Sequence, residues 1–268
     1  MWMWETELAP KGVVVIVHGA MEHHQRYGWL IEKWRGAGFH VVMGDLPGQG
    51  QTRKTRRGHI ESFDEYLTAV NEWIEAAFQF DLPVFLLGHS MGGLISIRLL
   101  QEKNYDLAGV ILSSPCLGLA KPPSKFLDFL SHGLNLVFPK MRIESGITVI
   151  EATRNPEVRE ADLNDSLYVT KVSVRWYREL MEAIKLSYKY LGYLQDVPML
   201  VMQGGEDKIV NKESVREWFS YAPLSEKRFK EWPQCYHEIF NEPERDDVFE
   251  YTLDFVYSQL RAIGYVIN

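Results

Sequence analysis

The chain has 268 residues, of which 46% are hydrophobic and 24% are charged. This composition is ordinary for a folded protein and provides enough apolar surface for a sizeable core. The formal net charge of −7 argues against nucleic acid as the main partner, because phosphate binding needs a basic face.

The cysteines and the N-terminal residues indicate the compartment. Cys116 and Cys235 are too few for a disulfide scaffold and lack the spacing of zinc ligands. Residues 1–7 show no basic segment followed by an apolar one, and no window reaches the roughly 20 apolar residues of a membrane span. We therefore expect a cytoplasmic protein, with peripheral membrane contact left open. The sequence indicates no oligomeric state.

Strands and helices alternate in the first half of the chain, which predicts a mostly parallel sheet flanked by helices. The β-branched run at 13–17 is typical of a strand that is buried on both faces. Further strands are expected at 39–43, 84–87 and 108–112. Between them, apolar residues at helical spacing predict helices near 27–36, 62–77 and from 93 onward.

This alternation stops between Cys116 and about Tyr190, where helical segments predominate and no comparable strand is expected. It resumes with strands at 197–202 and 228–232, followed by a final helix at 247–260. We therefore divide the chain into a core of residues 1–115 and 191–268 and an insertion of residues 116–190.

The segment 88–92 reads G-x-S-x-G, with an apolar strand before it and a helix after it. In that context the motif predicts a nucleophile elbow, a strained turn that exposes the hydroxyl of Ser90 above the sheet. The flanking glycines have a steric reason, because only residues without a Cβ let the neighbouring backbone pass so close.

A serine nucleophile needs a base, usually a histidine, and a carboxylate that orients the base. After Ser90, the candidates at the ends of strands are His237 and either Asp207 or its neighbour Glu206. Asp45 also follows a strand, but it precedes the serine, and we interpret it as a structural loop residue.

The tetrahedral intermediate of such a reaction needs hydrogen-bond donors for its oxyanion. The amide of Met91, in the first turn of the helix after Ser90, is one candidate. The amide of Ala20, in the loop after the first long strand, is the other. His18-Gly19 alone would indicate only a turn that ends this strand.

Four segments resemble the α/β-hydrolase superfamily, in particular its monoacylglycerol lipase and lysophospholipase (serine aminopeptidase S33-like) branch. Residues 18–27 resemble H-G-x-x-E-H-x-x-R-Y, 45–50 resemble D-x-x-G-x-G, 88–93 match G-H-S-M-G-G and 205–210 are similar to G-x-x-D-x-x-V. Gln49 departs from the pattern, because histidine is usual at its position.

The resemblance implies a mostly parallel central sheet flanked by helices, with a helical cap inserted after the sixth strand. It implies a serine hydrolase with Ser90, Asp207 and His237 as the catalytic triad. The amides of Ala20 and Met91 would be the oxyanion donors, and no metal or other cofactor would be needed. Cys235 lies two residues before His237, so it would affect the sensitivity of the protein to thiol reagents. A small buried residue near the site is the simpler interpretation.

The insertion is rich in Phe and Leu, which is typical of helix packing and also suits an acyl chain. Under the second interpretation, Phe126, Phe129 and Phe138 would contact a lipid-like substrate. We therefore expect an esterase for monoacylglycerols or lysophospholipids. A general carboxylesterase or aminopeptidase-like hydrolase is the alternative, and a non-catalytic ligand-binding protein on the same fold is a third.

Overall fold

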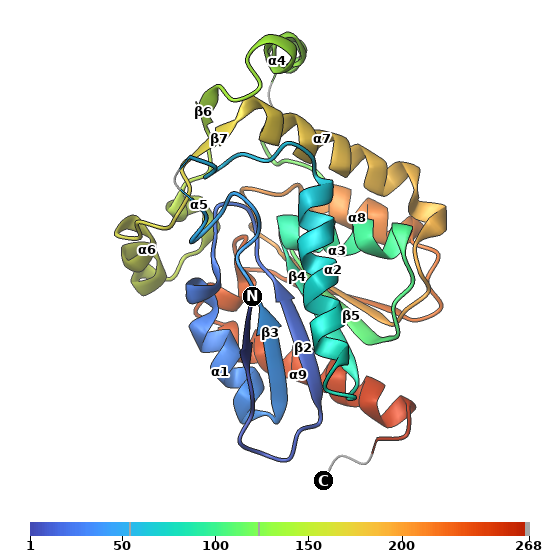
Figure 1. The fold of residues 1–268 in the computed structure, drawn as a ribbon. Helices are drawn as coiled ribbons and strands as arrows, with labels where there is room; N and C mark the ends of the chain where they lie inside the picture. The colour runs from blue at the N-terminus through green and yellow to red at the C-terminus, as the bar shows by residue number, and fades with distance from the viewer. Residues whose placement is uncertain (54, 123, 266–268) are drawn as a thin grey trace.

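The computed structural model describes residues 1–53, 55–122 and 124–265, and for residues 125–129 it describes the backbone alone. Seven strands form the central sheet in the order β1-β3-β2-β4-β5-β8-β9 (Figure 1). Their bounds are β1 (Trp2–Trp4), β2 (Gly12–Val17), β3 (Phe39–Met43), β4 (Val84–His89), β5 (Leu107–Ser113), β8 (Met199–Gly204) and β9 (Lys227–Trp232). All pairs are parallel except β1 with β3, so the sheet is mostly parallel, as expected.

Helices cover both faces of this sheet (Figure 1). One face carries α1 (Gly28–Gly36) and α9 (Arg245–Ala262), and the other carries α2 (Asp64–Phe78), α3 (Met91–Glu102) and α8 (Lys212–Tyr221). Alternate residues of each strand face opposite layers. In β2, for example, Val13 and Val15 pack toward α2 and α3, while Val14 and Ile16 pack toward α1 and α9. This double burial explains the unbroken β-branched run in the sequence.

The insertion lies between β5 and β8, above the carboxyl ends of the strands (Figure 1). It contains α4 (Lys125–Val137), β6 (Arg142–Glu144), α5 (Val149–Ala152), α6 (Pro156–Leu163), β7 (Lys171–Ser173) and α7 (Val174–Lys189). Three short 3-10 helices complete the described fold: η1 (His24–Tyr27), η2 (Leu191–Tyr193) and η3 (Ile239–Asn241).

The insertion differs from the expected helical cap in two respects. It follows β5, the fifth strand of the chain, and not the sixth. The expected strand number came from the family resemblance and not from the residues of this chain. It also contains a small antiparallel sheet of β6 and β7. These strands have three residues each, which is too short to give a periodic signal in the sequence.

Within the described residues, no helix combines the length and the apolar character needed to cross a membrane.

Candidate active site

Ser90 lies at the turn between β4 and α3, in a backbone conformation that is strained for a residue with a side chain. Its φ is +52° and its ψ is −117°. The two flanking glycines permit this turn. A Cβ on Gly88 would lie 2.6 Å from the carbonyl oxygen of Gly92, and a Cβ on Gly92 would lie 2.1 Å from that of Val17.

His237 lies between Ser90 and Asp207. The Ser90 hydroxyl is 2.8 Å from His237 Nε2, and His237 Nδ1 is 2.8 Å from Asp207 Oδ2. Because a carboxylate only accepts, Nδ1 carries the proton, and Nε2 is left to accept from the serine hydroxyl. Asp207 follows β8 and His237 follows β9, so neighbouring parallel strands bring the two side chains to the same edge of the sheet.

The carboxylate of Asp207 is fully buried, and both of its oxygens accept hydrogen bonds. Gln203 Nε2 donates to Oδ2 at 2.8 Å, and the amides of Ile209 and Val210 each donate to Oδ1 at 2.9 Å. Burial raises the pKa of Asp207, but His237 and the two amides outweigh burial and lower it below its ordinary value. Asp207 is therefore ionised at neutral pH. Glu206, the alternative acid, is exposed to solvent.

Ala20 and Met91 line the same cavity as Ser90. Met91 is the first residue of α3, where amides have no acceptor within the helix. Ala20 lies in the loop after β2, and among the described residues no hydrogen bond uses its amide. Both amides are therefore available beside the serine hydroxyl.

His18 and Glu22 hold the loop that contains Ala20. Nδ1 of His18 lies 2.7 Å from the Gly19 carbonyl oxygen, and its Nε2 accepts from the Leu46 amide at 2.9 Å. Burial is the main reason that the pKa of His18 is lowered to about 4, so the ring is neutral at pH 7. Oε2 of Glu22 accepts from the Gly19 amide at 2.6 Å and from the Tyr27 hydroxyl at 2.7 Å.

His89, the residue before Ser90, is separate from this arrangement. Its Nδ1 lies 3.1 Å from the carbonyl oxygen and 3.2 Å from the hydroxyl of Ser113. Burial and the neighbouring His237 lower the pKa of His89 to about 3. His89 is therefore a neutral packing residue, and its ring is tilted against that of His237 with 4.9 Å between the ring centroids.

An apolar cavity of about 170 Å³ opens beside Ser90. The core and the insertion both contribute to its wall. Its apolar lining consists of Ala20, Met21, Met91, Cys116, Leu119, Ile147, Trp176, Tyr177, Leu180 and Ile209. Polar side chains on the wall are Ser145, Glu151, Lys121 and Lys208.

A second, much smaller hollow of about 20 Å³ lies on the His237 side of Ser90. This volume has room for about one water molecule. Its wall includes Glu22, Tyr168 and Glu238 in addition to Ser90 and His237. The two hollows therefore lie on different sides of the serine, and the smaller one has the ionisable groups Glu22, Glu238 and His237 on its wall.

None of the three phenylalanines that we expected to contact the substrate is seen to line the cavity beside Ser90 in the described part of the chain. Phe138 is 61% exposed and does not line the cavity, because it follows the end of α4, which projects away from the core (Figure 1). The side chains of Phe126 and Phe129 lie outside the described residues. Trp176 and Leu180 of α7 line the cavity instead, and their helical spacing alone could not distinguish lining from packing.

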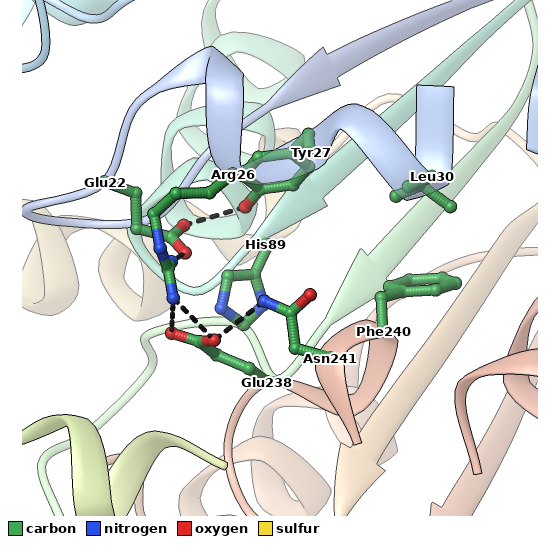
Figure 2. Close-up of a pocket in the computed structure, with 8 residues that line it drawn as sticks. All are labelled: Glu22, Arg26, Tyr27, Leu30, His89, Glu238, Phe240 and Asn241. Atoms are coloured by element: carbon green, nitrogen blue, oxygen red, sulfur yellow. Dashed lines mark hydrogen bonds and ion pairs between the residues drawn. The ribbon is translucent and has the colours of Figure 1, made fainter. Parts of the chain in front are cut away.

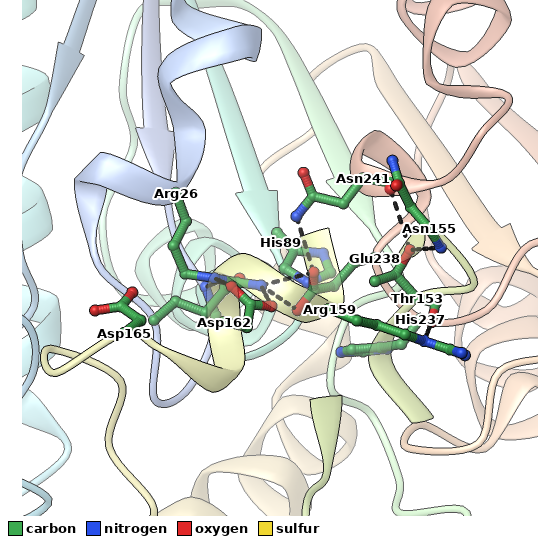
Figure 3. A network of polar contacts seen from close by, with 12 residues as sticks. Arg26, His89, Thr153, Asn155, Arg159, Asp162, Asp165, His237, Glu238 and Asn241 are labelled. Carbon is green, nitrogen blue, oxygen red and sulfur yellow. Dashed lines mark hydrogen bonds and ion pairs between the residues drawn. The ribbon is translucent and has the colours of Figure 1, made fainter. Parts of the chain in front are cut away.

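Behind the smaller hollow, Arg26 contacts three buried carboxylates, which belong to Glu22, Glu238 and Asp162 (Figure 2 and Figure 3). Glu22 and Arg26 belong to the motif at residues 18–27, but the sequence gives no signal that Asp162, from the insertion, joins them.

Cys235 is buried, and burial raises the pKa of its thiol to about 12. Among the described residues, no group of three or more His, Cys, Asp or Glu side chains is arranged to hold a metal ion.

Known proteins resemble this chain over most of its length. The family model for serine aminopeptidase S33 matches residues 9–244. Phospholipase YtpA of Bacillus subtilis is 55% identical over 251 residues, which cover 93% of this chain and 96% of that protein. Human monoglyceride lipase is 30% identical over 244 residues, which cover 89% of this chain and 79% of that protein.

The solved structures agree with the sequence relatives. The monoacylglycerol lipase of Paleococcus ferrophilus superposes with a TM-score of 0.86 at 31% identity, covering 96% of this chain and 98% of that one. The chain therefore belongs to the serine aminopeptidase S33 family, within the monoacylglycerol lipase and phospholipase branch of the α/β-hydrolase fold.

Proposed function

We propose that this protein is a serine hydrolase that cleaves carboxylic esters of lipid-like substrates, such as a monoacylglycerol or a lysophospholipid. The observation that carries the proposal is the continuous contact from the Ser90 hydroxyl through His237 to Asp207, with 2.8 Å at each step. A ligand-binding protein would need neither this chain of three groups nor a serine on a strained turn beside an apolar cavity.

In the proposed reaction, Ser90 Oγ attacks the acyl carbonyl carbon while His237 Nε2 accepts its proton. The ester C–O bond then breaks, and His237 returns the proton to the leaving alcohol. Water attacks the resulting acyl-enzyme and gives a proton to His237, which passes it to Ser90 as the fatty acid leaves. The buried, ionised Asp207 keeps the His237 proton on Nδ1 and stabilises the imidazolium.

The negative charge of the tetrahedral intermediate would be held by the amides of Ala20 and Met91. The helix dipole of α3 adds to the second of these donors, because Met91 is at its positive end. Removing one such donor typically costs about 3–4 kcal/mol of transition-state stabilisation.

We propose that residues 116–190 form a cap over the core of residues 1–115 and 191–268, and that the two parts enclose the substrate. The apolar cavity would receive the acyl chain, since its wall is built largely from Met, Leu, Ile and Trp side chains. The alcohol part would lie on the opposite side, where His237 has to protonate it. Phospholipase YtpA and the monoglyceride lipases, as relatives, support a lipid ester as substrate.

A panel of substrates tests this assignment. We expect turnover of monoacylglycerols or lysophospholipids to exceed that of acetate esters and of amino-acid amides, because only a long acyl chain fills the apolar cavity. Equal turnover of short esters would favour a general carboxylesterase, and faster cleavage of amides would favour a peptidase. Binding of acyl ligands without any turnover would favour the non-catalytic alternative.

We further propose that the end of α4 contacts membranes peripherally. Leu136 is 84% exposed and Val137 is 67% exposed, next to the exposed Phe138 and Lys140. Exposed apolar side chains beside basic ones are typical of a surface that inserts into the headgroup region. In a vesicle co-sedimentation assay, the Leu136→Asp/Val137→Asp variant should bind less than the wild type. Leu163→Asp, which changes a leucine on α6 that is 72% exposed, is the control.

A further inference from the structure

Arg26 connects three parts of the chain that are far apart in sequence. Its Nε and Nη2 donate to the two carboxylate oxygens of Asp162 at 2.8 and 2.5 Å, and Nη2 also donates to Glu238 Oε2 at 2.9 Å. Its Nη1 pairs with Glu22 Oε1. All four side chains are only 4–6% exposed. Figure 3 shows Asp162 approaching Arg26 from α6, opposite the loop of His237.

A buried guanidinium is stable only when its charge and its N–H groups are matched. Burial lowers the pKa of Arg26, but the carboxylates of Glu238 and Asp162 outweigh it and raise it, so the group stays charged. If one carboxylate is removed, the guanidinium has to shift toward the remaining two. The positions of the three carboxylates are therefore coupled through Arg26.

The first of these parts is the loop that carries Ala20. While Oε1 of Glu22 pairs with Arg26, its Oε2 accepts from the amide of Gly19, the residue before Ala20. The fit is tight, since a Cβ on Gly19 would lie 2.8 Å from Glu22 Oε2. A displacement of Arg26 would therefore pass to the peptide that presents the proposed oxyanion donor.

The second part is the loop that carries His237. Glu238 follows it directly, and its carboxylate is fixed by Arg26 and by Asn241 Nδ2, which donates at 2.8 Å (Figure 2). The amide of Glu238 donates at 2.9 Å to the carbonyl of Ala152 in the insertion. The insertion therefore contacts this loop through the backbone as well as through Arg26.

The third part is the insertion itself, from the end of α6 to β7. In addition to Asp162, its Asp165 Oδ2 lies 2.5 Å from His23 Nε2, and its Val169 amide donates to the Met21 carbonyl at 3.1 Å. Residues 21–26 and 162–169 thus make several adjacent contacts. The α6 end of the insertion is therefore bound to residues 18–23, the loop that carries Ala20 and that we call the oxyanion loop, whereas α4 projects away from the core (Figure 1).

We propose that Asp162 is a positioning residue for the reaction, although it touches neither the substrate nor the triad. Through Arg26 and Glu22 it holds the oxyanion loop, and through Arg26 and Glu238 it holds the loop of His237. Docking of the α6 end of the insertion then completes the active site as well as covering it. The inference rests on the proposed function.

The test is the variant Asp162→Asn, which keeps the size of the side chain and removes its charge. Its matched control is Glu160→Gln, an exposed position on the same helix. We expect kcat on a short soluble ester to fall about tenfold with KM within twofold of wild type. Affinity for an alkyl boronic acid, which resembles the tetrahedral intermediate, should fall by the same factor. Glu160→Gln should behave as wild type.

A double-mutant cycle separates positioning from a general loss of structure. If Asp162 acts through Arg26, then Asp162→Asn should cause no further loss of kcat in an Arg26→Met background. An equal loss in both backgrounds, or a raised KM with unchanged kcat, would overturn the proposal. If Asp162→Asn does not fold, Asp162→Glu, which keeps the charge but changes the distance to Arg26, is used instead. It should show a smaller loss of the same kind, and an unchanged kcat would again contradict us.

The rate at which a fluorophosphonate labels Ser90 distinguishes this proposal from the proposed function. Labelling needs the nucleophile and the oxyanion donors but no lipid substrate. If the wild type is labelled but turns over no lipid ester, the substrate assignment fails. Slower labelling of Asp162→Asn than of Glu160→Gln would still support the positioning role, and equal labelling rates would refute it.

Discussion

His18 links the stability of the protein to the loop that carries Ala20, the proposed oxyanion donor, and this link leads to a quantitative prediction. The ring is fully buried directly after β2, and its Nε2 accepts from the Leu46 amide. A protonated ring would present an N–H to that amide, so two donors would face each other. Burial accordingly lowers the pKa of His18 to about 4.

The size of the effect follows from the two pKa values. In the unfolded chain the ring titrates near 6.5, so below that pH the unfolded state binds a proton. The folded state does not bind this proton until the pH approaches its own, lower pKa. The free energy of unfolding therefore falls as the pH drops from about 6.5 to about 4. The difference between the pKa values, at about 1.4 kcal/mol per pH unit, corresponds to about 3 kcal/mol.

Urea unfolding at several pH values, followed by tryptophan fluorescence, measures this contribution. The perturbation is His18→Asn, which removes the titrating ring, and the control is His132→Asn, at an exposed position of α4. From pH 7 to pH 4, the wild type and the control should lose about 3 kcal/mol more than His18→Asn.

Parallel pH profiles for the wild type and His18→Asn would refute this prediction. Parallel profiles would mean that the folded and unfolded states bind the proton of this ring equally. A wild type that gained stability relative to the variant on acidification would contradict the sign of the effect.

Three further substitutions test other parts of the account. Asp207→Asn should lower kcat by about 10⁴-fold, because an amide favours the wrong imidazole tautomer; steady-state kinetics should show no such loss for Glu206→Gln. Trp176→Ala should cost about 3–5 kcal/mol in urea unfolding and shift the preferred acyl chain to a greater length, since it enlarges the cavity; an unchanged chain-length profile would contradict us. Gly92→Ala should lower Tm strongly, because its Cβ would meet the Val17 carbonyl oxygen at 2.1 Å, whereas Gly133→Ala, whose added Cβ meets no described atom outside its own stretch of helix within 4 Å, should not.

The sheet was predictable because its strands carry strong local signals. The run at 13–17 and the strand before Ser90 are apolar on both faces, which only a doubly covered parallel sheet explains. By contrast, β1, β6 and β7 have three residues each, and such short strands form because a neighbouring strand is present. Their sequences alone contain too little periodic information.

In the candidate site, too, some residues were predictable from local sequence signals and others were not. Ser90, Asp207 and His237 follow strands that the sequence already indicates, so parallel pairing places them at one edge of the sheet. Phe138 was expected to contact substrate, but an apolar side chain in an insertion can face the core or solvent, and here it faces solvent. The pairing of Arg26 with Asp162 spans 136 residues, and no local pattern predicts a contact between loops that far apart.

We propose above all that Ser90 is the nucleophile and that His237 activates it. The most direct test is to treat the protein with a fluorophosphonate and to identify the modified residue by peptide mass spectrometry. We predict a single adduct on Ser90, absent from Ser90→Ala and formed far more slowly in His237→Ala. An adduct on another residue, or undiminished labelling of Ser90→Ala, would contradict the account.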